Sequence, residues 1–107
     1  MTNNEYCIVT TTYADDKIGK NIIDSLLKKH LAACVQVQNV QSYYHWNNNI
    51  SCDNEKLLFI KTKKSLYKKV EEDILFNHDY ETPEIVMSSI ETGFSAYLNW
   101  IEKECIN

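Results

Sequence analysis

The sequence predicts one mixed α/β domain, in which strands and helices alternate along 107 residues. Apolar residues recur at helical spacing in some segments, whereas others are rich in β-branched residues or alternate apolar with polar residues. Only two glycines and one proline interrupt the chain, which leaves little room for linkers. We therefore expect a single domain that spans residues 1–107.

The predicted elements have the order βαββαβ, followed by an added C-terminal helix. Asp15 and Asp16 are N-cap candidates for the first helix, and the asparagines at 47–49 predict a tight hairpin turn. This order is that of the ferredoxin-like (α+β) fold, in which two helices cover one face of a four-stranded antiparallel sheet. The expected strands are 6–12, 33–44, 55–62 and 85–90, and the expected helices are 18–31, 66–74 and 94–105.

The third predicted strand has apolar side chains on both faces. Residues 57–60 read Leu-Leu-Phe-Ile, and successive side chains of a strand point to opposite faces. Two helices on one side cannot cover both faces, and exposed apolar area costs about 25 cal/mol per Å² relative to burial. Large apolar patches usually mark interfaces. We therefore expect self-association through the open face, unless the C-terminal helix covers that face by itself.

Composition excludes several classes of function. The formal net charge of −4 argues against nucleic-acid binding as the main role, although a local lysine-rich segment begins at Lys61. No apolar run approaches the roughly 20 residues of a membrane span, so no membrane role is predicted. Residues 1–5 lack the features of a secretory signal, so a cytoplasmic location is expected. None of the four cysteines forms a C-x-x-C pair of the kind found in zinc or redox motifs.

Five short motifs follow one another along most of the chain. They are LAACV at 31–35, S-x-Y-x-W at 42–46, Glu55 with Lys61-Thr62, H-x-Y-E-x-P-E at 78–84 and G-x-x-x-Y-L-x-W-I at 93–101. Their order and spacing resemble the CutA family. The resemblance implies a ferredoxin-like homotrimer, in which long second and third strands extend the sheets of neighbouring subunits. It also implies an association with copper and divalent-cation tolerance, without an established enzymatic activity.

The resemblance is incomplete at the copper site. Family members assigned such a site use a cysteine late in the first strand and two adjacent histidines. The corresponding positions here are Thr11, Asn77 and His78, so only His78 is retained. One imidazole alone makes a weak transition-metal site, because affinity and geometry require several ligands. We therefore expect this chain to share the family's association with metals more than its copper ligands.

Candidate site residues come from the motif segments. His78 is a possible metal ligand among acidic neighbours, or a histidine hydrogen-bonded at a subunit boundary. Lys61 is expected to pair with Glu81 or Glu84, or to bind an anion. The aromatic side chains either pack in the core and in interfaces or line an inter-subunit cleft. The predicted ligand-binding cleft consists of Lys61, His78, Tyr80, Glu81, Glu84, Tyr44, Trp46 and Trp100.

These candidates support different functions. The leading hypothesis is a non-enzymatic homotrimer for divalent-cation (copper) tolerance, with no required cofactor and with copper or another divalent cation as a possible ligand. The alternative is a PII-like sensor or scaffold trimer that binds an anionic small molecule in its inter-subunit clefts. A hydrolase that uses Glu81 or Glu84 as a carboxylate catalyst lacks a recognisable nucleophile in the sequence.

Overall fold

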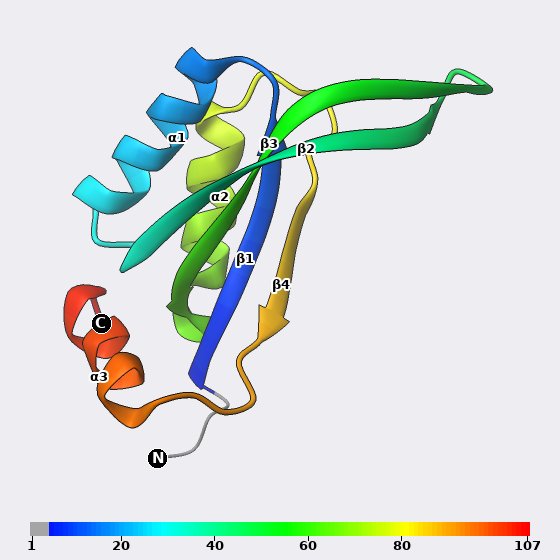
Figure 1. The fold of residues 1–107 in the computed structure, drawn as a ribbon. Helices are drawn as coiled ribbons and strands as arrows, with labels where there is room; N and C mark the ends of the chain where they lie inside the picture. Colours follow the sequence, from blue (N-terminus) through cyan, green and yellow to red (C-terminus); the bar gives the residue numbers. More distant parts are fainter. Residues whose placement is uncertain (1–4) are drawn as a thin grey trace.

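A computed structural model describes residues 5–107 and contains one four-stranded antiparallel sheet, with the strand order β2-β3-β1-β4 (Figure 1). The strand order and the antiparallel pairing are those of the ferredoxin-like arrangement, so the predicted fold class is confirmed. The elements are β1 (Tyr6–Tyr13), α1 (Asp16–Lys28), β2 (Cys34–Trp46), β3 (Asn49–Lys63), the 3₁₀ turn η2 (Lys64–Leu66), α2 (Tyr67–Asn77), β4 (Ile85–Ser89) and α3 (Ser95–Glu104).

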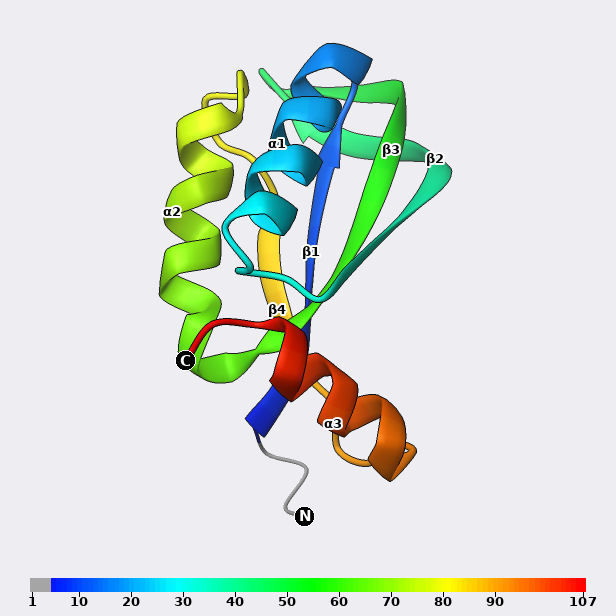
Figure 2. The ribbon, with the colours of Figure 1, turned by 90° about the vertical axis from the view of Figure 1, so that its left-hand side faces the viewer.

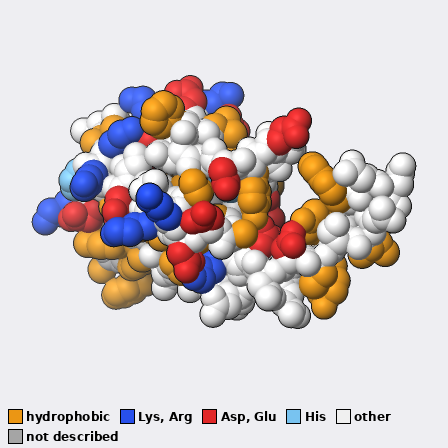
Figure 3. Space-filling view, turned by 90° about the horizontal axis from the view of Figure 1, so that it is seen from above, with side chains coloured by type: hydrophobic (Ala, Val, Ile, Leu, Met, Phe, Trp, Pro, Cys, Tyr) orange, Lys and Arg blue, Asp and Glu red, His pale blue; other side chains and the backbone are white. Residues whose placement is uncertain are grey.

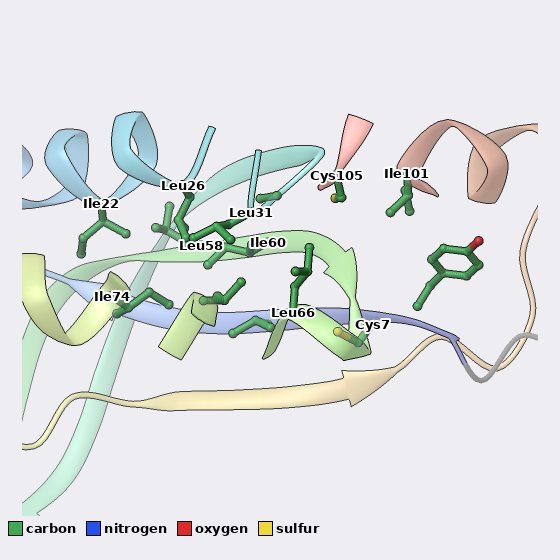
Figure 4. Close-up of a cluster of buried hydrophobic side chains, with 14 of the residues drawn as sticks. Cys7, Ile22, Leu26, Leu31, Leu58, Ile60, Leu66, Ile74, Ile101 and Cys105 are labelled. Carbon is green, nitrogen blue, oxygen red and sulfur yellow. The ribbon is translucent and has the colours of Figure 1, made fainter. Parts of the chain in front are cut away.

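Helices α1 and α2 lie side by side on one face of the sheet (Figure 2). Alternate residues of the central strands point toward them, so Val9, Leu58 and Ile60 are fully buried. Figure 4 shows Ile22 and Leu26 of α1 and Ile74 of α2 closing over these strands. The apolar faces predicted from helical spacing therefore form the core. None of the helices within residues 5–107 is long and apolar enough to cross a membrane.

The ends of α1 show one feature that was predicted and one that was not. The Asp15 carboxylate accepts hydrogen bonds from the backbone N–H groups of Lys17 and Ile18, as expected of an N-cap. The helix was expected to reach residue 31 but ends at Lys28. His30 adopts a left-handed conformation (φ 54°), and the N–H of Leu31 then returns to the carbonyl of Leu26. Apolar spacing alone did not reveal this stop.

The β2–β3 hairpin projects beyond the body of the molecule (Figure 1). Its two-residue turn is formed by Asn47 and Asn48, whose φ angles of 50° and 64° match the predicted left-handed turn. Strand β3 starts at Asn49, although the apolar pattern predicted a start at 55. The added residues are mostly polar because this part of the hairpin extends into solvent and pairs only with β2.

The sheet face opposite α1 and α2 stays largely open. Ile8 and Phe59, neighbours on this face, are only half-buried, and Val86 is 51% exposed. Helix α3 does not cover them, because it packs across the end of the sheet where β1 begins and β3 ends. The alternative in which α3 alone hides this face is therefore wrong.

The Glu102 carboxylate holds α3 against the end of the sheet through two contacts. Glu102 accepts a 3.0 Å ion-paired hydrogen bond from Lys63 Nζ and a 3.0 Å hydrogen bond from the Tyr6 hydroxyl. Lys63 is buried, so Glu102 supplies the negative charge that this ammonium group requires. The hydrogen bond from Lys63, followed by that from Tyr6, lowers the pKa of Glu102.

We predict that this contact makes stability depend on acid pH. Because the fold lowers the Glu102 pKa, its stabilisation is complete above the unfolded-state pKa of about 4.3. It is lost as the pH falls through the lower folded-state pKa. The contribution of the charge is at most about 1 kcal/mol, since the carboxylate is 43% exposed and screened by solvent.

Urea unfolding of the wild type and E102Q across an acid pH series measures this effect. The two free energies of unfolding should differ near neutral pH and converge near about pH 2. The matched control E72Q changes an exposed carboxylate on α2 and should follow the wild type throughout. A difference between wild type and E102Q that does not shrink in acid would contradict the proposed charge effect.

Candidate functional site

A cleft of about 880 Å³ separates the projecting hairpin from the loop between α2 and β4. Figure 3 shows this hollow from above, with acidic and hydrophobic side chains around it. Five of the eight predicted cleft residues line it, from both walls. These five residues are Tyr44, Trp46, Tyr80, Glu81 and Glu84.

The cleft carries strong negative charge. Five carboxylates line it and no lysine does, whereas the Lys–carboxylate ion pairs of residues 5–107 involve other acidic groups. The formal net charge of the whole chain is −4, which is smaller in magnitude than the charge of the five cleft carboxylates. The rest of the chain therefore carries no excess of negative charge. A low-dielectric concave wall strengthens the field of such charges, so the cleft attracts cations. The carboxylates are Asp53, Glu55, Asp79, Glu81 and Glu84.

Two tyrosines hold two of these carboxylates in place. The Tyr80 hydroxyl donates a 2.5 Å hydrogen bond to Glu55, which ties the loop to β3. The Tyr44 hydroxyl donates to Asp53 across the hairpin. Burial, and then the hydrogen bond to Glu55, raises the pKa of Tyr80, while the hydrogen bond to Asp53 is the main cause of the raised pKa of Tyr44. Both phenols therefore stay protonated and act as donors.

His78 lies behind the cleft wall and does not line the cleft. Its side chain is 1% exposed, and its ring lies 4.5 Å from the Tyr80 ring. One ring nitrogen, Nε2, lies 2.8 Å from the Thr12 carbonyl oxygen, to which it donates. The other, Nδ1, accepts a 3.2 Å hydrogen bond from the Tyr80 N–H. With both nitrogens engaged, His78 positions Tyr80, and binding a metal would require one of these bonds to break.

Two further predicted residues lie in a separate group near α3. Lys61 Nζ donates to Gln36 Oε1 at 2.8 Å and to the Tyr97 hydroxyl at 3.4 Å. The Tyr97 ring stacks on Trp100 with 5.7 Å between centroids. Lys61 and Trp100 therefore do not line the cleft of their own chain.

The predicted pairing of Lys61 with Glu81 or Glu84 is wrong within one chain. Lys61 lies opposite Ile8 of β1, whereas Glu84 accepts a 3.4 Å hydrogen bond from Thr10, further along that strand. Sequence reasoning also missed Asp53 as a cleft residue and noted Glu55 only as part of a motif. The pairing of Ser42 with Asp53 and of Val40 with Glu55 places both acidic side chains on the Tyr44 face of the hairpin. The register of the hairpin is the signal that could have identified Asp53 and Glu55 as cleft residues.

Comparisons with known proteins agree with this geometry. The family described as CutA1 divalent ion tolerance protein matches residues 7–104. The chain belongs to the CutA1 family. A crystal structure of CutA1 from the psychrotrophic bacterium Shewanella sp. SIB1 superimposes with a TM-score of 0.92 and 36% identity, covering 98% of this chain and 99% of that one.

Relatives in the CutA1 family also correct the predicted location. The chloroplastic protein CutA of Arabidopsis thaliana is 35% identical over 94% of this chain and 56% of its own length. The periplasmic divalent cation tolerance protein CutA of Archaeoglobus fulgidus has a TM-score of 0.89 and 28% identity, covering 92% and 97% of the two chains. These relatives are placed outside the cytoplasm, so the cytoplasmic prediction is wrong.

The chain spans about half the length of the plant and mammalian CutA relatives that it matches, which extend beyond the shared domain. Its match to the Shewanella structure is, by contrast, nearly end to end. The shared part of the CutA1 family therefore includes the sheet, the hairpin and both cleft walls.

The residues present do not fit a copper site. Within residues 5–107, no group of three or more His, Cys, Asp or Glu side chains is placed to hold a metal ion. Thr11 is buried on the helix-covered face, and the Asn77 amide donates to the Asp73 carbonyl oxygen. Copper requires several converging nitrogen or sulfur ligands, which the described part of one chain does not provide. Copper binding through His78 stays a prediction.

We predict that Y80F loosens the loop between α2 and β4. The change removes the hydroxyl donor to Glu55 and leaves that half-buried carboxylate less satisfied, which should lower the free energy of unfolding by about 1–2 kcal/mol. Urea unfolding measures the loss. Tyr43 is 69% exposed on the other face of the hairpin, so the control Y43F should change stability by less than about 0.5 kcal/mol. Equal effects of the two variants would show that the Tyr80–Glu55 bond is not stabilising.

Proposed function

We propose that this chain is a non-enzymatic homotrimer that contributes to divalent-cation tolerance by attracting cations to its acidic cleft. The observation that carries the proposal is the concentration of five carboxylates, without a lysine, in one concave surface. Membership of a family described as divalent ion tolerance proteins supports the same role.

The chemistry of the cleft favours cations that prefer oxygen. Carboxylate oxygens suit hard ions such as magnesium, calcium and manganese. Glu81 and Glu84 are exposed, and Glu84 accepts only a long 3.4 Å hydrogen bond from Thr10, whereas Glu55 and Asp53 are held by tyrosines. A softer ion such as copper would need additional ligands from a neighbouring copy.

Exposed apolar surface supports the trimer. The open sheet face carries Phe59 and Val86, and the hairpin carries Trp46 and Ile50, which are 53% and 74% exposed. Apolar area of this kind is usually covered by a partner. The Lys61–Trp100 group of one copy is complementary in charge to the acidic cleft of another. A shared cleft would thus gather seven of the eight residues that the sequence predicted for one site, with His78 behind its wall.

A second candidate is a PII-like sensor of an anionic small molecule. Lys61 supports it, because its ammonium lies 5.6 Å from the centre of the Tyr97 ring, which stacks on Trp100, so that a cation stands beside aromatic surface. The charge of the cleft opposes it, since five carboxylates repel an anion there. An anionic ligand is therefore proposed only for the Lys61 group.

We predict that the native mass in dilute solution is three times the 12.5 kDa of the chain. The physical reason is the uncovered sheet face and hairpin. Light scattering after size exclusion measures the mass. The substitution F59E introduces a carboxylate on the open face and should yield monomers, whereas the charge reversal E72K on α2 should leave the trimer intact. A wild-type protein that remains a folded monomer at micromolar concentration would contradict the trimer.

We predict that divalent cations bind in the cleft through its carboxylates. Isothermal titration with calcium, manganese and copper should show binding that weakens about tenfold in E81Q/E84Q, because two nearby charges are removed. The control E72Q/E91Q removes two exposed charges elsewhere. H78A tests His78 as a copper ligand: if His78 binds copper, the variant should weaken copper binding more than calcium binding, since any displacement of Tyr80 affects both ions. Binding that is equal in both double variants would show that the cleft is not the cation site.

A further inference from the structure

The three positions that the CutA resemblance assigns to copper ligands lie together in this fold. They are Thr11 of β1, Asn77 at the end of α2 and His78 immediately after it. His78 Nε2 lies 2.8 Å from the carbonyl oxygen of Thr12, the residue that follows Thr11. The backbone therefore brings the three positions together, and their donor atoms decide whether copper fits.

The donor atoms at these positions do not suit copper. Thr11 Oγ1 is a neutral hydroxyl oxygen that is buried without a hydrogen-bond partner among residues 5–107. The Asn77 amide donates a 2.8 Å hydrogen bond to the Asp73 carbonyl oxygen, four residues earlier in α2. Copper prefers thiolate and imidazole ligands to neutral oxygens. Only the His78 imidazole is of that kind, and both of its nitrogens are engaged in hydrogen bonds.

A second copy of the chain does not supply the missing ligands. Thr11 is 0% exposed on the sheet face that α1 and α2 cover, and the His78 side chain is 1% exposed. Association with other copies only buries these groups further. A side chain from another copy therefore reaches neither of them while the chain stays folded.

Other residues of the same chain do not complete a copper site either. Cys7 lies on the same face of β1 as Thr11, but four residues along a strand amount to about 13 Å, too far for both to bind one ion. Asp79 Oδ1 lies 3.4 Å from His78 Nδ1, but a carboxylate suits harder ions than copper. Within residues 5–107, no three His, Cys, Asp or Glu side chains are placed to hold a metal ion.

We infer that this chain does not bind copper at these positions, either as one chain or as a trimer, and that Asn77 and His78 form a hydrogen-bonded joint there instead. The Asn77 amide satisfies a carbonyl of the last turn of α2. His78 links the Thr12 carbonyl oxygen to the N–H of Tyr80, which ties the end of α2 to β1 and to the loop that leads to β4. The proposed function does not depend on this joint, because cations that prefer oxygen would bind through the cleft carboxylates.

The test is a copper(II) titration of the full chain, followed by electron paramagnetic resonance and by competition with a chelator of known affinity. H78N removes the imidazole and keeps a side-chain oxygen that can accept from the Tyr80 N–H, so its copper affinity should equal that of the wild type. Loss of even an outer-shell group costs about 10–100-fold in metal affinity, so a loss of that size in H78N would overturn the inference. The matched control H45N removes an exposed histidine of the hairpin. A loss confined to H45N would support the inference, since it would place the copper on that histidine.

Replacement of the missing donors gives a second test. T11C/N77H adds a thiol and an imidazole beside His78 and should create a copper site, seen as the visible charge-transfer band of a copper–thiolate bond. The matched control T11S/N77Q keeps neutral donors and should show no such band. A folded T11C/N77H protein that binds copper no more tightly than T11S/N77Q would overturn the claim that these donors exclude copper.

Circular dichroism checks that the variants fold. If the double variant does not, N77H alone changes a half-buried residue and provides the same test. It should tighten copper binding because it places a second imidazole next to His78, and an unchanged affinity would overturn the claim.

Discussion

The pairing of β2 with β3 is the constraint on which the rest of the structure depends. The ladder runs from Cys34 opposite Lys61 to Trp46 opposite Asn49, and its register decides which side chains share a face. One face presents Tyr44 and Trp46 next to Asp53 and Glu55. A shift of β2 by one residue along β3 would turn Tyr44 and Trp46 to the opposite face, away from Asp53 and Glu55. The same ladder thus positions both the core and the site.

Charge is distributed unevenly over this framework. Lysines pair with carboxylates around the helices and at the sheet end, as with Lys29 and Asp73 or Lys63 and Glu102. The cleft has no such lysine, and two of its five carboxylates, Asp53 and Glu55, are held by tyrosine hydroxyls instead. A neutral donor fixes a carboxylate without cancelling its charge. This arrangement preserves the attraction for cations that the proposed function requires.

Much of the fold was predictable, whereas the grouping of the site residues was not. Periodicity revealed the strands and helices because each buries one regular face, as Ile22 and Leu26 show for α1. It underestimated the length of β3, whose first residues are mostly exposed and polar. It also missed the end of α1, where His30 adopts a left-handed backbone conformation. The separation of Lys61 from Glu84 follows from their partners along β1, Ile8 and Thr10. Single-sequence patterns do not contain such long-range register.

The contact between Tyr6 and Glu102 joins residues that are 96 positions apart. Closing so large a loop costs entropy that only the completed sheet can offset, so α3 is expected to dock late in folding. On the ribosome, β1 emerges well before either of its partners, β3 and β4. During that interval its apolar residues have no sheet to join. A nascent chain of this topology therefore leaves the apolar residues of its central strand uncovered, and open to contact with other chains, until that strand is flanked on both sides.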